Sequence, residues 1–243
     1  MLLAIDIGNT STKYGIFDRK GTLLQRDVLN EGKIIPQKII AQFSVKSAIY
    51  SATGNISDVM LAQIKGFAHA LELTHDTPVP IQSEYLTPET LGRDRLAAVC
   101  GAHGLFAHQN VLIIDAGTCM TYEVLSEDGV YLGGNIAPGL KMRLQAMHEF
   151  TAQLPIVSVS LPKEMIGKST ETALQNGAIR GSLLEITDFR RRIQRKMGKT
   201  RTILTGGDAN FLAKNLNFST FVERDLVLTG LYSIYAYNFF AQA

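Results

Sequence analysis

The chain begins with a short apolar run that stops at a carboxylate. Five apolar residues precede Asp6, and the segment Gly8–Thr12 that follows consists of glycine, asparagine and hydroxyl residues. An apolar run bounded by turn-forming residues predicts a buried strand followed by a tight turn. A second strand, a hairpin turn at Lys20-Gly21 and a third strand are expected next.

The same pattern returns in the second half of the chain. Asp115 stands 109 residues after Asp6, and the same offset aligns Gly117 with Gly8. A hairpin turn is expected again at Asp128-Gly129. Because the flanking strands and the hairpin turn recur together with the Asp-x-Gly pattern, the repeat predicts two similar lobes.

Helical and strand-like segments alternate after each triplet of strands, which is typical of an α/β fold. The N-terminal lobe is expected over residues 1–108 and the C-terminal lobe over 109–243, with the last helix packing back on the first lobe. Helix caps are expected at Asp58, Thr87 and Thr170. The predicted helices span residues 36–43, 58–70, 87–106, 170–197, 209–215 and 226–240, and short strands are predicted at 47–51 and 203–204.

Composition, charge and cysteine usage narrow the functional classes. Hydrophobic residues make up 46% and charged residues 19% of the chain, which provides for a sizeable core. The net charge of +2 requires neither a nucleic acid nor an anionic membrane as partner. Cys100 and Cys119 form no CxxC pair, so neither a disulfide framework nor a zinc site is expected. Neither a signal peptide nor a membrane span is predicted, and the cytoplasm is the expected location.

The two Asp-x-Gly turns suggest phosphate binding. A carboxylate at the end of a buried strand, with glycine and hydroxyl residues close behind, stands beside exposed backbone amides. Phosphate oxygens need such donors, and their metal ion needs an anionic oxygen ligand. Two turns facing each other across a cleft could hold a triphosphate from both sides, whereas a plain hairpin role remains the alternative. The GxxxxGK[ST] and GxGxxG patterns of other nucleotide-binding folds are absent.

The tetrapeptide Gly92-Arg93-Asp94-Arg95 is a second candidate for chemistry. A carboxylate within hydrogen-bonding distance of an alcohol can accept its proton and make the alcohol an effective nucleophile. Arg93 and Arg95 can offer forked donors to a carboxylate or a phosphoryl group. From the residues alone, a solvated cluster of ion pairs is the favoured interpretation of this segment.

Six segments in order along the chain resemble those of the type III pantothenate kinases, within the superfamily of acetate and sugar kinases, heat-shock chaperones and actin. The resemblance implies two ribonuclease H-like, actin-like lobes, each a mixed sheet flanked by helices, with a nucleotide cleft between them. The segments are DIGNTSTK (6–13), GRDR (92–95), DAGT (115–118), GGNIAPG (133–139), STETALQNGAIRG (169–181) and LTGGDA (204–209).

This resemblance also implies an activity. Members of the family transfer the γ-phosphoryl group of ATP to the primary hydroxyl of pantothenate, which gives 4'-phosphopantothenate in the first step of coenzyme A biosynthesis. ATP, Mg²⁺ and a monovalent cation, K⁺ or NH₄⁺, are the implied cofactors. Pantothenate and ATP are the implied small-molecule partners, and the implied assembly is a homodimer.

The matching positions assign roles to individual residues. Asp94 corresponds to the catalytic base, Asp115 to a ligand of the monovalent cation, and Asp6 to a residue near Mg²⁺. The implied ATP-binding residues are Asp6, Ile7, Gly8, Asn9, Thr10, Ser11, Thr12, Lys13 and Thr118. The implied pantothenate-binding residues are Tyr85, Gly92, Arg93, Asp94, Arg95 and Thr170. The chain departs from the family at Glu123, where an aspartate is common, so a metal role at this position is in doubt.

A basic segment over residues 189–201 raises the alternative of a nucleic-acid-binding surface. Leu183, Ile186 and Phe189 recur at helical spacing, which instead predicts a buried stripe with the arginines on the solvated side. No nucleic acid or membrane partner is therefore expected. Two further alternatives are a related kinase that acts on another alcohol and a non-catalytic accessory factor for transcription.

Overall fold

A computed structural model describes residues 1–29 and 33–240 of the chain. The chain divides into two compact units. The first comprises Met1–His108, Asp128–Leu132 and Asp225–Ala243, and the second comprises Gln109–Glu127 and Gly133–Arg224. Each unit carries strands of a mixed sheet flanked by helices, so the predicted α/β class is confirmed.

The sheet of the first unit has five strands in the order β3-β2-β1-β4-β5. Its central strand β1 is antiparallel to β2 and parallel to β4, which places Asp6 between Lys13 on one neighbour and Ser51 on the other. The strands are β1 (Leu2–Ile7), β2 (Thr12–Phe17), β3 (Leu23–Leu29), β4 (Ser47–Ala52) and β5 (His69–Glu72). Asp6 therefore lies near the end of a strand that has a hydrogen-bonded neighbouring strand on each side.

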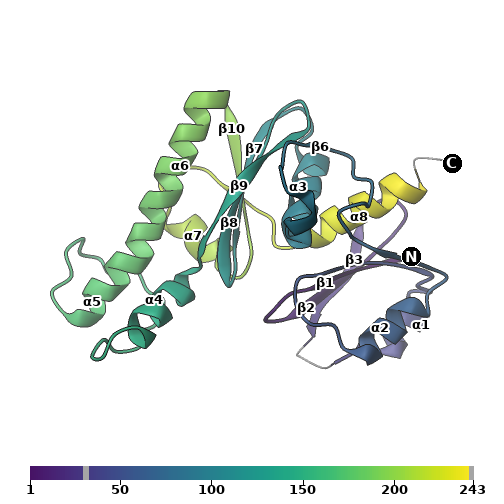
Figure 1. Cartoon of the computed structure of the whole chain (residues 1–243), viewed down its shortest axis with the longest axis horizontal. Coiled ribbons are helices and arrows are strands. Elements are labelled where there is room, and N and C mark those ends of the chain that lie inside the picture. Colours follow the sequence, from purple (N-terminus) through teal and green to yellow (C-terminus); the bar gives the residue numbers. More distant parts are fainter. Residues whose placement is uncertain (30–32, 241–243) are drawn as a thin grey trace. The chain divides into compact units, whose positions relative to one another are not determined.

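Helices pack on both faces of this sheet (Figure 1). Leu3, Ile5 and Ile7 of β1 share a core with residues of α1 and α2. Because side chains alternate along a strand, Asp6 belongs to the other face, where α3 and α8 contact the sheet. The helices are α1 (Gln37–Gln42), α2 (Asp58–Lys65), α3 (Arg93–Leu105) and α8 (Leu226–Phe239).

The second sheet has the order β11-β10-β7-β8-β9-β6. Its two outer segments are short, and β6 pairs with Val130 and Tyr131, which belong to the first unit together with β6 itself. The strands are β6 (Gln82–Ser83), β7 (Asn110–Ala116), β8 (Cys119–Leu125), β9 (Val130–Pro138), β10 (Thr200–Thr205) and β11 (Phe221–Val222). Asp115 lies near the C-terminal end of β7, which is flanked by β8 and β10.

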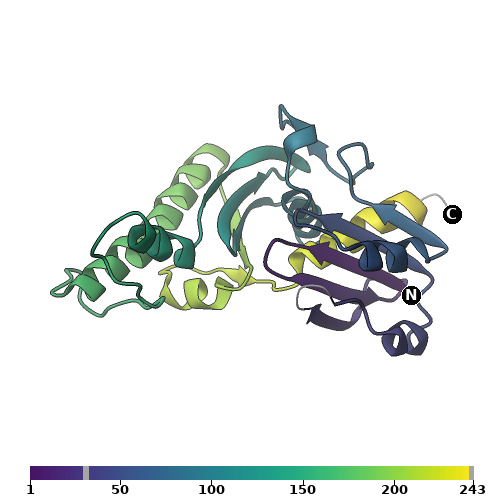
Figure 2. The ribbon, with the colours of Figure 1, turned by 60° about the horizontal axis from the view of Figure 1, so that its bottom comes forward.

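Two helices of the second unit, α5 and α6, form one long helical segment. Figures 1 and 2 show α5 continuing into α6, with a π-helical turn over Asn176–Arg180 between them. The predicted cap at Thr170 is wrong by one residue, because Ser169 accepts the Thr172 amide and Thr172 bonds back to Ser169 in a capping box. The helices are α4 (Leu140–Glu149), α5 (Thr170–Gln175), α6 (Gly181–Met197) and α7 (Ala209–Asn215).

Two of the other predicted helices need correction. The helix predicted over 58–70 ends at Lys65, since Gly66 terminates it and His69 begins β5, and its cap is Ser57 rather than Asp58. The helix predicted over 87–106 is divided into a 3₁₀ turn, Pro88–Thr90, and α3. Leu91 adopts an extended backbone conformation after the 3₁₀ turn and Gly92 precedes the helix, so α3 starts at Arg93. The Thr87 side chain forms no capping hydrogen bond.

Candidate active site

Asp6 is a nearly buried carboxylate at the end of β1, with 8% of its surface exposed. The Ser51 hydroxyl donates a hydrogen bond to its Oδ1 at 3.1 Å. Burial raises the pKa of Asp6 to about 6, and the charge of Asp94 adds to the rise, while Lys13 and the Ser51 hydrogen bond oppose it. The folded chain thus holds a carboxylate that a cation or a proton would stabilise.

The turn after Asp6 is supported by the loop that follows β4. The amides of Thr53 and Gly54 both donate to the Ile7 carbonyl, and a side chain on Gly54 would collide with the Gly8 carbonyl. Beside this turn lies a cavity of about 320 Å³. Its lining consists of Ile7, Gly8, Asn9, Thr10, Ser11, Thr12, Lys33, Asn55, Ile56, Ser57 and Met60. Amides, hydroxyls and one ammonium group around a cavity form an environment suited to an anion.

The start of α3 fixes the orientation of Asp94. The Arg95 amide donates to Asp94 Oδ1 at 2.9 Å. A side chain at Gly92 would lie 2.6 Å from the same oxygen, so glycine leaves room for this carboxylate. Because the charge of Asp94 raises the pKa of Asp6, the structure brings these two predicted residues into electrostatic contact within the first unit.

Arg95 belongs to a cluster with two tyrosines. Its guanidinium donates to the Tyr85 hydroxyl at 3.3 Å and to the Tyr131 hydroxyl at 3.1 Å. The two phenol rings stack with centroids 5.9 Å apart, and the guanidinium carbon lies 5.4 Å from the centroid of the Tyr85 ring. Tyr131 is fully buried and was not predicted as a site residue. Its only sequence signal is a tyrosine beside the Asp128-Gly129 turn.

Arg93 occupies a different environment from Arg95. Its guanidinium donates to the backbone carbonyls of Pro88, Glu89 and Leu91. These bonds tie the 3₁₀ turn to the start of α3. The Arg93 guanidinium, predicted to bind the substrate, thus donates to the main chain. The Arg95 guanidinium instead lies among aromatic side chains.

The second unit repeats the acidic turn with different surroundings. Asp115 is half-buried and pairs in register with Thr121 of β8. Gly206 has a positive φ of 87°, and a side chain there would collide with Asp115 Oδ1 and the Ala116 carbonyl. Thr118 is exposed in the turn, and its carbonyl accepts the Gly139 amide at 3.1 Å. Asp115 and Thr118 are thus held close to glycine backbone on two sides.

Thr170 belongs to the second unit, whereas the other predicted pantothenate-binding residues belong to the first. It is the exposed first residue of α5 in the second unit.

The donors around Asp6 fit a magnesium ion that arrives with phosphates. Across residues 1–29 and 33–240, no three histidine, cysteine, aspartate or glutamate side chains form a metal-binding group. Mg²⁺ keeps several water ligands and commonly uses one or two carboxylates together with substrate phosphates. A nearly buried carboxylate next to a turn whose hydroxyl residues line a cavity of about 320 Å³ is consistent with that mode of binding.

Comparison with known proteins decides the family. The model of the family "Type III pantothenate kinase" matches residues 2–192. A type III pantothenate kinase from Phocaeicola vulgatus is 41% identical over 241 residues, which is 98% of this chain and 99% of that protein. The chain belongs to the type III pantothenate kinase family.

The fold of this type III pantothenate kinase family member is similar to that of solved structures with low sequence identity to it. A Campylobacter jejuni protein assigned to the Baf family of transcriptional activators aligns with a TM-score of 0.64 at 22% identity, over 97% of this chain and 98% of that one. The activator of 2-hydroxyisocaproyl-CoA dehydratase from Clostridium difficile, solved with bound ADPNP, aligns with a TM-score of 0.52 at 13% identity, over 100% and 97% of the two chains. Both likenesses support the fold alone. None of the helices within the described residues is long and apolar enough to span a bilayer.

Proposed function

We propose that this protein is an ATP-dependent pantothenate kinase that makes 4'-phosphopantothenate, the first step of coenzyme A biosynthesis. The observation that carries the proposal, beside membership of the family, is the pairing of two carboxylates in the first unit. Asp6 ends the phosphate-type turn, and Asp94 stands close enough to raise its pKa. A kinase needs one acidic group near the phosphates and another for the acceptor hydroxyl.

In this proposal the turn Asp6–Lys13 binds the phosphates of ATP through backbone amides, hydroxyl groups and the Lys13 ammonium. Asp94 accepts the proton of the primary hydroxyl of pantothenate. The hydroxyl oxygen then forms a bond to the γ-phosphorus as the bond between that phosphorus and the bridging oxygen breaks, and ADP leaves with the electron pair. The proton remains on Asp94 until solvent removes it.

Arg95 and Tyr85 would bind the pantothenate. Arg95 is 6% exposed and donates to the hydroxyls of Tyr85 and Tyr131, and its guanidinium would bind the pantothenate carboxylate through forked hydrogen bonds. Gly92 leaves space for the base, Arg93 supports the loop, and Thr170 is retained as a substrate contact from the family resemblance. The role of Tyr131 is to support Arg95.

Thr118 and Asp115 are assigned to the nucleotide and to a monovalent cation, K⁺ or NH₄⁺. Carboxylate and carbonyl oxygens can ligate K⁺ or accept hydrogen bonds from NH₄⁺, and Asp115 lies against the Gly206 backbone. Mg²⁺, held near Asp6 together with the phosphates, would neutralise charge that develops on the transferred group.

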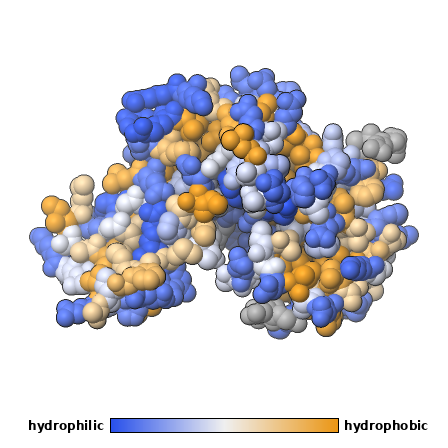
Figure 3. All heavy atoms as spheres, viewed as in Figure 1, coloured by the Kyte–Doolittle hydropathy of each residue, from blue (hydrophilic) through white to orange (hydrophobic). Residues whose placement is uncertain are grey.

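We also propose a homodimer located in the cytoplasm. Exposed apolar residues gather on α4, α6 and the segment between α4 and α5, and Figure 3 shows apolar side chains at the surface of this part of the second unit. Such a surface is typical of an interface with another protein chain. The residues concerned are Met142, Phe150, Ile156, Met165, Ile166 and Leu184. A solution mass of twice the 26.6 kDa chain mass is expected.

The test is ADP release measured with a coupled assay, with pantothenate present and absent, followed by mass spectrometry of the product. Pantothenate-dependent ADP release with formation of 4'-phosphopantothenate supports the proposal. ADP release only with another alcohol would establish a related small-molecule kinase instead. Nucleic-acid binding without turnover would favour the accessory-factor alternative.

A further inference from the structure

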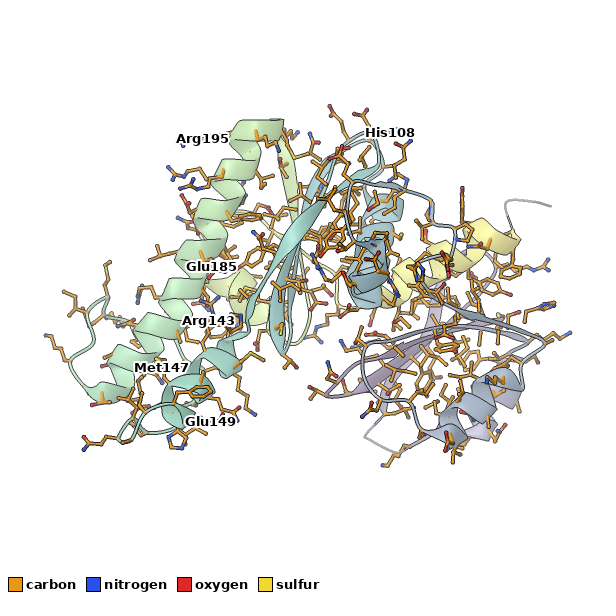
Figure 4. The ribbon with its side chains drawn as sticks, viewed as in Figure 1. His108, Arg143, Met147, Glu149, Glu185 and Arg195 are labelled. Carbon is orange, nitrogen blue, oxygen red and sulfur yellow. The ribbon has the colours of Figure 1, made fainter. Side chains whose placement is uncertain are left out.

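Three polar side chains of the second unit, Tyr122, Arg143 and Glu185, form a connected group. Glu185 of α6 accepts hydrogen bonds from two sides: the Tyr122 hydroxyl donates to Oε1 at 2.6 Å, and Arg143 Nη2 donates to Oε2 at 2.7 Å. Figure 4 shows Arg143 on α4 near Glu185 on α6. The bidentate use of the Glu185 carboxylate thus joins β8, α4 and α6.

The group reaches the Gly117-Thr118 turn from the α4 side. Arg143 Nε donates to the Pro138 carbonyl at 2.8 Å, at the point where β9 ends. The next residue, Gly139, donates its amide to the Thr118 carbonyl, and a side chain there would collide with the carbonyls of Gly117 and Thr118. A shift of Arg143 would therefore be transmitted to the turn through one tightly packed glycine.

The group also reaches the turn through β8. Tyr122 of β8 pairs with Ile114 of β7, and the Gly117-Thr118 turn immediately precedes β8. Tyr122 is 2% exposed, so its hydroxyl needs a protein acceptor. Met120 Sδ lies 3.1 Å from the same hydroxyl, but a thioether is a weak acceptor and the carboxylate is the stronger partner. Burial and the Glu185 hydrogen bond both raise the pKa of Tyr122, which keeps the phenol a donor.

We propose that Tyr122, Glu185 and Arg143 are positioning residues that hold the Gly117-Thr118 turn in the conformation that binds the nucleotide. The inference rests on the proposed function, in which Thr118 contacts ATP. These residues touch neither the transferred phosphoryl group nor the acceptor alcohol in this account. Their loss is therefore expected to weaken nucleotide binding while leaving pantothenate binding nearly unchanged.

The experiment compares Glu185→Gln and Tyr122→Phe with the control Asp188→Asn. Asp188 lies on the same helix and also pairs with arginines, Arg191 and Arg192, but those partners are exposed and the group does not reach the turn. The readouts are KM for ATP, KM for pantothenate, the dissociation constant of ADP and the thermal unfolding midpoint. A hydrogen bond to a charged group corresponds to roughly a tenfold change in a binding constant, and that is the expected rise in KM for ATP and in the ADP constant for Glu185→Gln. A smaller rise, about threefold, is expected for Tyr122→Phe, which leaves the Arg143 pair intact.

The inference is overturned if Glu185→Gln and Tyr122→Phe, both folded, bind ADP as the Asp188→Asn control does. It is also overturned if the variants change both Michaelis constants equally, because that result would indicate a general loss of structure. If Glu185→Gln fails to fold, Tyr122→Phe decides the matter, since it removes one oxygen without changing the ring. Wild-type protein without pantothenate-dependent turnover would instead refute the proposed function, and ADP titration would still test the positioning role.

Discussion

The two acidic turns share a scaffold but differ in their surroundings. Both Asp6 and Asp115 stand at the end of a buried strand and precede a glycine two positions later. Asp6 is nearly buried, with Lys13 opposite it and the Ser51 hydroxyl on its oxygen, whereas Asp115 is half-buried, faces Thr121 and lies against Gly206. A duplicated strand–turn–strand unit thus presents one carboxylate beside an ammonium group and the other beside backbone.

The turns also differ in length. Ile7 pairs with Thr12 across the first turn, which leaves four residues between the strands, while Ala116 pairs with Met120 and leaves three. The longer turn offers more backbone amides and hydroxyl groups, as phosphate binding requires, and the shorter one offers fewer. The comparison teaches that repetition of the fold leaves each copy free to acquire its own chemistry.

Replacing each acid by its amide gives the largest expected difference between the turns. Asp6→Asn is expected to lower kcat about a hundredfold or more, because the phosphates lose the anionic neighbour of their metal ion. Asp115→Asn is expected to lower activity about tenfold and to change its dependence on K⁺ concentration. Steady-state kinetics at several K⁺ and Mg²⁺ concentrations check both expectations. Equal losses with equal cation dependence would contradict the assignment of separate roles.

The pH dependence of stability sharpens the contrast. The folded-state pKa of Asp6, about 6, lies above its ordinary value of 3.8, so the folded state binds more protons between these values. The stabilising effect of protonated Asp6 is full below about pH 4 and disappears as the pH rises through 6. The free energy of unfolding of Asp6→Asn should therefore exceed that of wild type by up to about 3 kcal/mol above pH 7 and by less toward pH 4. Urea unfolding without ligands measures this difference. A difference between the two proteins that does not vary with pH would contradict the burial of the Asp6 charge.

Glycine substitutions probe the turn of the second unit. Gly206→Ala places a side chain against Asp115 and the Ala116 carbonyl at a positive φ, so a loss of about 1–3 kcal/mol of unfolding free energy is expected. Gly207→Ala meets nothing within 4 Å and serves as the matched control. Urea unfolding measures both, and equal stability of the two variants would argue against the close contact with Asp115.

Lys33 gives the smallest expected effect. It is exposed and lines the cavity beside the first turn, so Lys33→Met should raise KM for ATP about threefold, with a weaker effect at high salt. Lys38→Met on α1 removes an exposed lysine outside the cavity lining and should leave KM unchanged. If the two variants behave alike, the cavity does not receive the phosphates.

Local patterns predicted the strand–turn–strand repeat well, because apolar runs and turn residues act within a few positions. They failed where distant atoms decide the structure. Arg93 bonds to three carbonyls of the preceding turn, which divides a helix that Thr87 and Pro88 had suggested was continuous. Tyr131 joins the Arg95 cluster through the pairing of β6 with β9, and nothing in the spacing of the sequence indicates that pairing.

The same limit applies to the candidate site. Asp6 and Asp94 are 88 positions apart, and the packing of α3 against β4, the neighbour of β1, brings their charges together. The resemblance to a family assigned both residues, whereas the residues themselves could only suggest a carboxylate with a nearby glycine. The buried state of Asp6 and its raised pKa come from the fold.

The central claim is that Asp94 takes the proton of pantothenate while the Asp6 turn holds ATP. The most direct measurement compares wild type and Asp94→Asn by pantothenate-dependent ADP release and by ADP titration under the same conditions. The account predicts that Asp94→Asn loses about a thousandfold in kcat and binds ADP within about twofold of wild type. Near-normal turnover of this variant, with intact folding, would contradict the account.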